Sequence, residues 1–273
     1  MRTNPFTLRR LRNSLLTGLV AIGLCWVTEV GRSRFYDVSF YLGYLLAGMI
    51  LFLAAFNLRK KLTTFRVGTS AGWLQFHLYL GLLTPVVFGL HTSWAWPNGK
   101  FEQVLAGIYT VTFLSGVYGL YLTRKLPRFL TRLPVELIYE QYDQQFHSIK
   151  NEATSEIRAS IGMSGDVSEK YVKRVIRFLS RRRTIFYYLW PTIYKRRRLI
   201  NHLRSYHRYA SAEEYARLER LEQLIARRDD YDFHHALQWK LRAWIFGHLA
   251  LTWSMLALVL MHLVLVHLYR GSY

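Results

Sequence analysis

The chain contains a single cysteine among its 273 residues, and this scarcity excludes several kinds of redox centre. One thiol cannot form a disulfide within the chain, and it cannot supply the thiolates of an ordinary iron–sulfur cluster. It also excludes the C-x-x-C-H sequence that attaches haem through thioether bonds. Covalently attached haem is therefore not expected.

Nucleotide-binding motifs are missing as well, since neither a G-x-G-x-x-G pattern nor a phosphate-binding loop occurs. Acidic residues are scarce: 17 Asp and Glu stand against 37 Lys and Arg, for a net charge of +20. A positive charge of this size would suit nucleic-acid binding, but no nucleic-acid recognition motif accompanies the basic runs. We therefore expect no nucleic-acid binding and no direct use of a nicotinamide cofactor.

Long uncharged stretches are present in place of these features. They cover residues 13–28, 38–58, 67–99, 103–123 and 243–269. A membrane span needs about 20 mostly apolar residues, and the first stretch reaches that length if Glu29 lies at headgroup level. These stretches predict an all-α membrane bundle of five transmembrane helices with a long helical insertion between helices four and five. The expected parts are helices one to four in 1–123, a basic cytoplasmic insertion in 124–242, and helix five with an outer tail in 243–273.

Basic residues gather before the first stretch and in the second and fourth connections, whereas the other connections are nearly balanced in charge. By the positive-inside rule the N-terminus and the insertion are cytoplasmic and the C-terminus is outside. The basic start and the apolar run after it predict an uncleaved signal-anchor. We expect an integral protein of the bacterial inner membrane with a periplasmic C-terminus.

Two of the apolar stretches carry a histidine pair with the same spacing, His77 with His91 and His248 with His262. Fourteen helical residues come to within about 40° of whole turns, so both histidines of a pair share one face, about 21 Å apart. Both helices run outward, which places His77 level with His248 and His91 level with His262. A six-coordinate b-type haem takes one imidazole on each side of its iron. The four histidines are therefore predicted to ligate two non-covalent b haems.

A single buried histidine can instead bond a neighbouring helix or line a proton path. No Asp, Glu, Lys or Arg at the other deep positions could join these histidines in such a relay. Gly81 and Thr252 would leave room for a flat macrocycle, although small residues also serve ordinary helix contacts. Arg124 and Arg242, at the inner ends of helices four and five, are candidate partners for haem propionates or headgroup anchors.

Three further positions in or near the histidine helices carry expectations. Pro85 should kink its helix and free a backbone carbonyl that Thr84 or a neighbour satisfies. His267 is expected at the interface because it lies on another face from His262. His234 is not expected to be a ligand because its surroundings are too polar for the bilayer core.

The pattern of ligands, depth and topology resembles the ferric reductase-like transmembrane domain, a family that includes the membrane part of NADPH oxidases. The resemblance covers the five spans, and it implies two stacked b haems held by His77, His91, His248 and His262. The sixth helix and the flavin and nicotinamide domains of the oxidases have no counterpart here. The resemblance thus implies an electron-transfer subunit with a redox partner on the outer side, a cytochrome or oxidoreductase component, and a quinone as a further candidate.

Other functions stay open on the sequence alone. A terminal reductase would pass electrons from the outer haem to ferric iron or oxygen, and it would need an open face near His91, Trp94 and Trp96. A non-redox membrane anchor or transporter would use the histidines for packing or protons. A reduced-minus-oxidised absorption spectrum separates this last alternative from the two redox functions.

The insertion has helical patterns of its own. Ser211 and Glu214 form a capping box before an apolar stripe, and that helix is expected to end at Asp229 and Asp230. An earlier helix is expected to begin near Asp166 or Ser168. The aromatic run 186–190 and the basic run 195–198 indicate a segment on a membrane surface, with docking of an acidic redox partner as the alternative.

Overall fold

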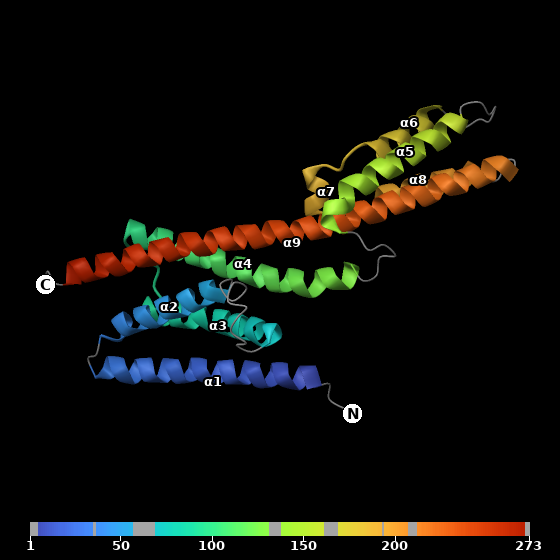
Figure 1. The fold of residues 1–273 in the computed structure, drawn as a ribbon. Helices are drawn as coiled ribbons and strands as arrows, with labels where there is room; N and C mark the ends of the chain where they lie inside the picture. Colours follow the sequence, from blue (N-terminus) through green and yellow to red (C-terminus); the bar gives the residue numbers. More distant parts are fainter. Residues whose placement is uncertain are drawn as a thin grey trace. The chain divides into compact units, whose positions relative to one another are not determined.

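The computed structural model describes residues 5–34, 37–56, 69–130, 138–160, 169–192, 194–206 and 212–270. Every regular element within these ranges is a helix, which confirms the all-α fold class for the described part of the chain (Figure 1). The chain divides into two compact units. One comprises Met1–Tyr118 and Phe246–Tyr273, and the other comprises Gly119–Ile245.

Four helices are long and apolar enough to cross a membrane: α1 (Pro5–Ser33), α3 (Ser70–His91), α4 (Lys100–Leu130) and α9 (Ala212–Arg270). A fifth helix, α2 (Val38–Ala54), is apolar but has only 17 residues. The uncharged part of α9 is its stretch 243–269. Many large apolar side chains of the first unit point outward, such as Ile22 and Trp26 of α1, each 68% exposed. Such surfaces suit lipid rather than water, so the chain has the character of a membrane protein.

The core of the first unit is shared by all of its helices. Helix α2 packs chiefly against α3, and α1 contacts both. Leu46 and Ile50 of α2 are buried with Val87 of α3, Tyr109 of α4 and Met255 of α9. The faces that carry the predicted histidines thus turn toward a common interior rather than toward lipid.

Pro85 lies inside α3, and the hydrogen bond that it removes is replaced. Proline has no N–H to donate to the carbonyl four residues earlier, which here belongs to Gly81. The Thr84 hydroxyl donates to the Gly81 oxygen at 2.8 Å, and the Tyr109 hydroxyl donates to Thr84 at 3.0 Å. The expectation that Thr84 satisfies the freed carbonyl is confirmed.

Helix α3 ends directly at His91. Ser93 and Trp94 adopt left-handed backbone angles, with φ of 53° and 58°, and the Trp94 N–H donates to the Gly89 carbonyl at 2.7 Å. The Trp94 ring lies over Gly89, where a Cβ atom would approach it to 2.5 Å. Glycine at this position therefore allows the tight turn that follows the histidine.

The second unit is a helical domain built on the first part of α9. It contains η2 (Tyr139–Gln141), α5 (Tyr142–Ser160), α6 (Glu169–Ser180), α7 (Ile185–Leu189), α8 (Tyr194–Tyr206) and the end of α4. Val175 and Leu179 of α6 are buried, whereas Ile176 is 38% exposed. The predicted starts at Asp166, Ser168 and Ser211 lie outside the described residues.

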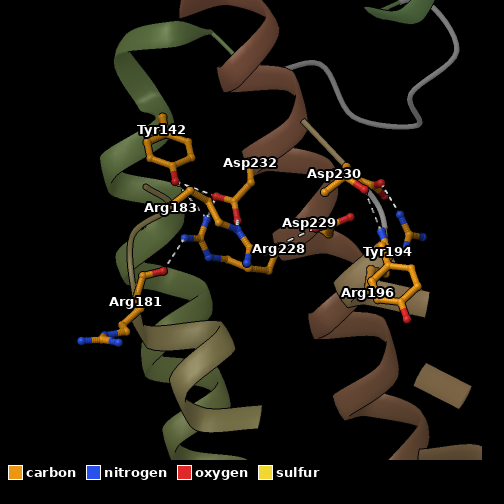
Figure 2. Close-up of polar contacts among 10 residues, drawn as sticks. Tyr142, Arg181, Arg183, Tyr194, Arg196, Arg228, Asp229, Asp230 and Asp232 are labelled. Carbon is orange, nitrogen blue, oxygen red and sulfur yellow. Dashed lines mark hydrogen bonds and ion pairs between the residues drawn. The ribbon is translucent and has the colours of Figure 1, made fainter. Parts of the chain in front are cut away.

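The expected helix end at Asp229 and Asp230 is wrong, because α9 continues without a break to Arg270. Both carboxylates are buried, as is Asp232 one turn later. Arginines surround them: Arg183 pairs with Asp229 and Asp232, Arg196 with Asp230, and Arg228 with Asp232 (Figure 2). Acidic residues that find buried cationic partners do not need the water that a helix end would offer.

Candidate functional site

His91 of α3 and His262 of α9, here named the outer pair after the expected topology, lie with their rings near each other in the first unit. The two ring centres are 6.5 Å apart and the ring planes are 86° apart. A histidine nitrogen bonds a transition metal at about 2 Å and lies about 1.1 Å from its ring centre, so two axial imidazoles have centres about 6 Å apart. The spacing therefore fits one metal ion between the rings.

Both rings line a cavity of about 570 Å³. Its walls come from α2, α3, α4 and α9 and are mostly apolar, with Phe88, Met255 and Val259 among them. This volume falls in the range of cofactor and small-molecule sites, about 300–1,000 Å³. The described lining includes the carboxylates of Asp37 and Glu102 but no Lys or Arg. The cavity suits the apolar body of a macrocycle, and its lining supplies no cation for a propionate.

A backbone carbonyl of α2 fixes the orientation of His91. The His91 Nδ1 atom lies 2.7 Å from the carbonyl oxygen of Ser39. A carbonyl only accepts, so Nδ1 carries the proton and Nε2 of the neutral ring keeps its lone pair for a metal. Gly43 makes room for the ring, because a Cβ atom there would lie 3.0 Å from His91 Cε1.

His77 of α3 and His248 of α9, here named the inner pair after the expected topology, lie close enough for their rings to interact electrostatically. His248 Nδ1 lies 3.2 Å from the Ser115 hydroxyl of α4. A Cβ atom at Gly116 would lie 3.6 Å from His248 Cε1, which is ordinary contact. A serine of a neighbouring helix thus contacts Nδ1 at both levels, through its carbonyl at His91 and through its hydroxyl at His248.

The His77 ring packs against Phe56, with ring centres 4.9 Å apart. Its Nδ1 atom is buried and has no hydrogen-bond partner within the described ranges. A buried polar atom without a partner costs about 1–3 kcal/mol. A metal bond is one of the ways in which proteins satisfy an imidazole nitrogen, so this atom also fits a metal-ligating role.

The two small residues predicted between the ligands have different surroundings. A Cβ atom at Gly81 would meet nothing within 4 Å, so the position borders open space. The Thr252 hydroxyl donates to the His248 carbonyl of its own helix at 2.8 Å. Neither residue lines the 570 Å³ cavity. Their proposed part in a pocket stays a prediction.

The two candidate propionate partners belong to the second unit. Arg124 is exposed. Arg242 lies 2.7 Å from Glu140 and over the Tyr139 ring at 4.0 Å. Their contacts in this unit do not bear on haem binding, and a role at the inner site stays a prediction.

Two further histidines of α9, His234 and His267, were not expected to be ligands, and this stays a prediction. His234 is buried in the second unit. His267 is exposed near the outer end of α9, where its Nε2 lies 2.5 Å from the Tyr44 hydroxyl and its Nδ1 donates to the Leu263 carbonyl. His267 also lines the outer cavity.

Several contributing residues were missed from the sequence. Ser39 and Gly43 set the position of His91, and Ser115 contacts His248. Arg32, at the end of α1, donates to the Leu90 carbonyl at 2.9 Å, one residue before His91. These residues lie on other helices than the histidines that they contact, and no sequence spacing links them. Only helix packing brings them to the site.

The comparisons with known proteins add no information on the two histidine pairs. No family model, no curated protein and no solved structure matches this chain.

Proposed function

We propose that this protein transfers electrons across a membrane and holds two non-covalent b haems for that purpose. His77 and His248 would hold the inner haem, and His91 and His262 the outer one. The observation that carries the proposal is the outer pair, whose ring centres lie 6.5 Å apart beside a cavity of about 570 Å³. The inner pair supports it by repeating the serine contact to a histidine Nδ1 atom.

When bound, haem would supply reversible one-electron redox chemistry. The residues would bind and orient it. The Ser39 carbonyl keeps the proton of His91 on Nδ1, so that Nε2 stays available as a ligand. Apolar walls such as Phe88 and Val259 would exclude water from the ring faces.

The proposed topology has five spans, with α2 as the second of them. Its 17 residues rise about 26 Å, and 17 is the lower end of the range for spanning helices, about 17–25 residues. The distribution of Lys and Arg would place the N-terminus and the second unit in the cytoplasm of a bacterium and the C-terminus in the periplasm. Electrons would then be exchanged with a redox partner on the periplasmic side, and a quinone is a candidate donor.

A second candidate is a terminal reductase that passes electrons from the outer site to a small acceptor. Two tryptophans favour it, because Trp94 and Trp96 beside His91 are 69% and 58% exposed. Trp96 also lines the outer cavity, so this cavity has an exposed side chain in its wall. Oxidation of the dithionite-reduced protein by a ferric chelate, with no other protein present, would favour the reductase over an electron-transfer subunit.

The haem content of the purified protein tests the proposal. A pyridine haemochrome assay should give two b haems per chain, and acidic acetone should extract both because no thioether bond can form. The absence of haem from protein produced with an adequate haem supply would overturn the proposal. One haem per chain would overturn the two-site arrangement.

A further inference from the structure

The segment between Arg183 and Arg196 exposes a cluster of apolar and aromatic side chains, here named the aromatic patch. Two of its members are exposed to an unusual degree, Phe186 at 73% and Trp190 at 74%. The patch consists of Ile185, Phe186, Leu189, Trp190 and Tyr194. Exposed apolar clusters of this kind mark sites of interaction with proteins or membranes.

Ion pairs fasten both ends of this segment to α9 (Figure 2). Before the patch, the Arg183 guanidinium lies 2.6 Å from Asp232 and 3.3 Å from Asp229. After the patch, Arg196 lies 2.5 Å from Asp230. The three carboxylates are buried, and buried paired charges are costly to separate. The patch is therefore held in a fixed place on α9.

The middle of the segment contacts the last turns of α9 before its apolar stretch. The Tyr188 hydroxyl lies 3.2 Å from His235 Nδ1, and the Tyr188 ring packs on Trp239 with ring centres 5.4 Å apart. Lys240 Nζ donates to the Leu189 carbonyl at 3.1 Å. These contacts fix the height of the patch along α9 to the level of 235–240.

That level lies next to the start of the uncharged stretch of α9, where a membrane boundary is expected. The uncharged stretch of α9 begins at Ala243, and Lys240 lies only about 4–5 Å before it along the helix. Each headgroup layer is about 5–8 Å thick. Helix α4 marks the same level, because Leu126 packs with Leu237 of α9 and the charged Lys125 stands next to it. If α9 enters the membrane at Ala243, the patch has the depth of the headgroups.

We propose that the aromatic patch inserts into the headgroup layer of the leaflet from which α4 and α9 emerge, and that its occupant is an anionic phospholipid surface. Tryptophan and tyrosine are enriched at this depth because their rings are amphipathic. Arg197 and Arg198 are exposed directly after the patch, and they attract anionic headgroups. The proposal rests on the membrane-spanning character of α4 and α9 and not on haem binding.

A lipid surface fits the patch better than an acidic soluble protein does. An acidic partner would account for the arginines, but it would not account for exposed apolar side chains next to a membrane boundary. If water surrounded the patch, the apolar side chains of Phe186 and Trp190 would stay exposed to it. The bilayer that α9 is expected to cross would cover them. Binding of an acidic soluble protein is the alternative that the experiment below can favour instead.

Spin labels measure the depth of the patch in the full-length protein. Cys25 is replaced by Ser, and single cysteines are introduced by Phe186→Cys and, as a control on the same unit, Ala216→Cys. Ala216 is exposed and lies about 40 Å before Ala243 along α9. Collision rates with oxygen and with a water-soluble nickel chelate are measured in nanodiscs of phosphatidylcholine, with and without phosphatidylglycerol. A label at Trp190→Cys repeats the measurement with Phe186 intact.

The label at residue 186 should be several-fold less accessible to nickel than the label at 216, and more accessible to oxygen. Phosphatidylglycerol should strengthen this shielding, and Arg197→Gln with Arg198→Gln should remove the effect of lipid charge, whereas Arg220→Gln should not. Equal nickel access at 186, 190 and 216 would overturn the proposal in favour of a soluble partner. Shielding that does not respond to phosphatidylglycerol would overturn the anionic character of the surface.

Discussion

The hydrogen bond between His91 Nδ1 and the Ser39 carbonyl decides which nitrogen of this ring is available. A carbonyl accepts and never donates, so the tautomer follows from one contact. Proteins that bind metals through histidine hold the second nitrogen in this way, and loss of such partners typically costs about 10–100-fold in metal affinity. Under the proposed function, the contact would hold the His91 ring ready to act as a ligand through Nε2.

Gly43→Ala should weaken the outer site, because the new Cβ atom would lie 3.0 Å from His91 Cε1 and push the ring away. Gly48→Ala is the matched control on the same helix, since its Cβ atom would meet nothing within 4 Å. Both changes gain about 0.5–1 kcal/mol of helix propensity. Haem content and the redox midpoint of the outer haem should change in Gly43→Ala alone. The same behaviour in both variants would contradict the close contact.

Burial raises the pKa of Asp229 to about 6, from an ordinary value of 3.8, although Arg183 opposes the shift. The folded chain therefore keeps this proton between about pH 4 and 6 while the unfolded chain has lost it. Proton binding by Asp229 therefore stabilises the folded chain at low pH, and this stabilisation is lost as the pH rises through 6. From pH 5 to pH 7 this one group therefore lowers the free energy of unfolding by about 1 kcal/mol.

Asp229→Asn should remove that pH dependence. Thermal midpoints followed by circular dichroism at pH 5 and pH 7 should show that the wild-type chain gains more stability on acidification than the variant does. Asp143→Asn is the control, because its side chain is 62% exposed in its pair with Arg182. If wild type and Asp229→Asn respond to pH in parallel, the raised pKa is contradicted.

At the scale of elements, α3 depends on a substitute for a missing hydrogen bond. Proline within a helix removes one backbone bond and leaves a carbonyl without its donor. The chain from the Tyr109 hydroxyl through Thr84 to the Gly81 carbonyl supplies that donor from a side chain. It also ties α4 to α3 between the two levels of histidines. Helix α3 can therefore keep both of its histidines in place across the proline.

Thr84→Val should destabilise the protein by about 0.5–1.5 kcal/mol, because the half-buried Gly81 carbonyl would lose its replacement hydrogen bond. Thr112→Val is the control: its hydroxyl donates to the Ile108 carbonyl of its own helix, which the helical backbone already serves. Thermal unfolding in detergent should separate the two variants by several degrees. Equal losses would show that the Gly81 carbonyl does not depend on Thr84.

At the scale of the whole molecule, the all-α class and the membrane-spanning character follow from the sequence because they depend on local composition. The spacing of His77, His91, His248 and His262 also shows from the sequence, since a helix converts spacing into depth. The continuity of α9 through Asp229 does not follow from the sequence. Charges look like a helix end when read along the chain, and only the distant Arg183 and Arg196 make them suitable for burial. The same reason explains why the roles of Ser39, Gly43 and Ser115 could not be predicted. Each lies on a different helix from the histidine that it contacts.

Redox titration of four single variants tests the pairing of the histidines most directly. His77→Ala and His248→Ala should each lose the inner haem and leave one haem with the same midpoint potential. His91→Ala and His262→Ala should each leave the other haem, with its own single midpoint. A crossed pairing would have to bridge about 21 Å along the helices, beyond the reach of ligands to one iron. If the two variants of either pair leave haems with different midpoints, the two-site account is contradicted.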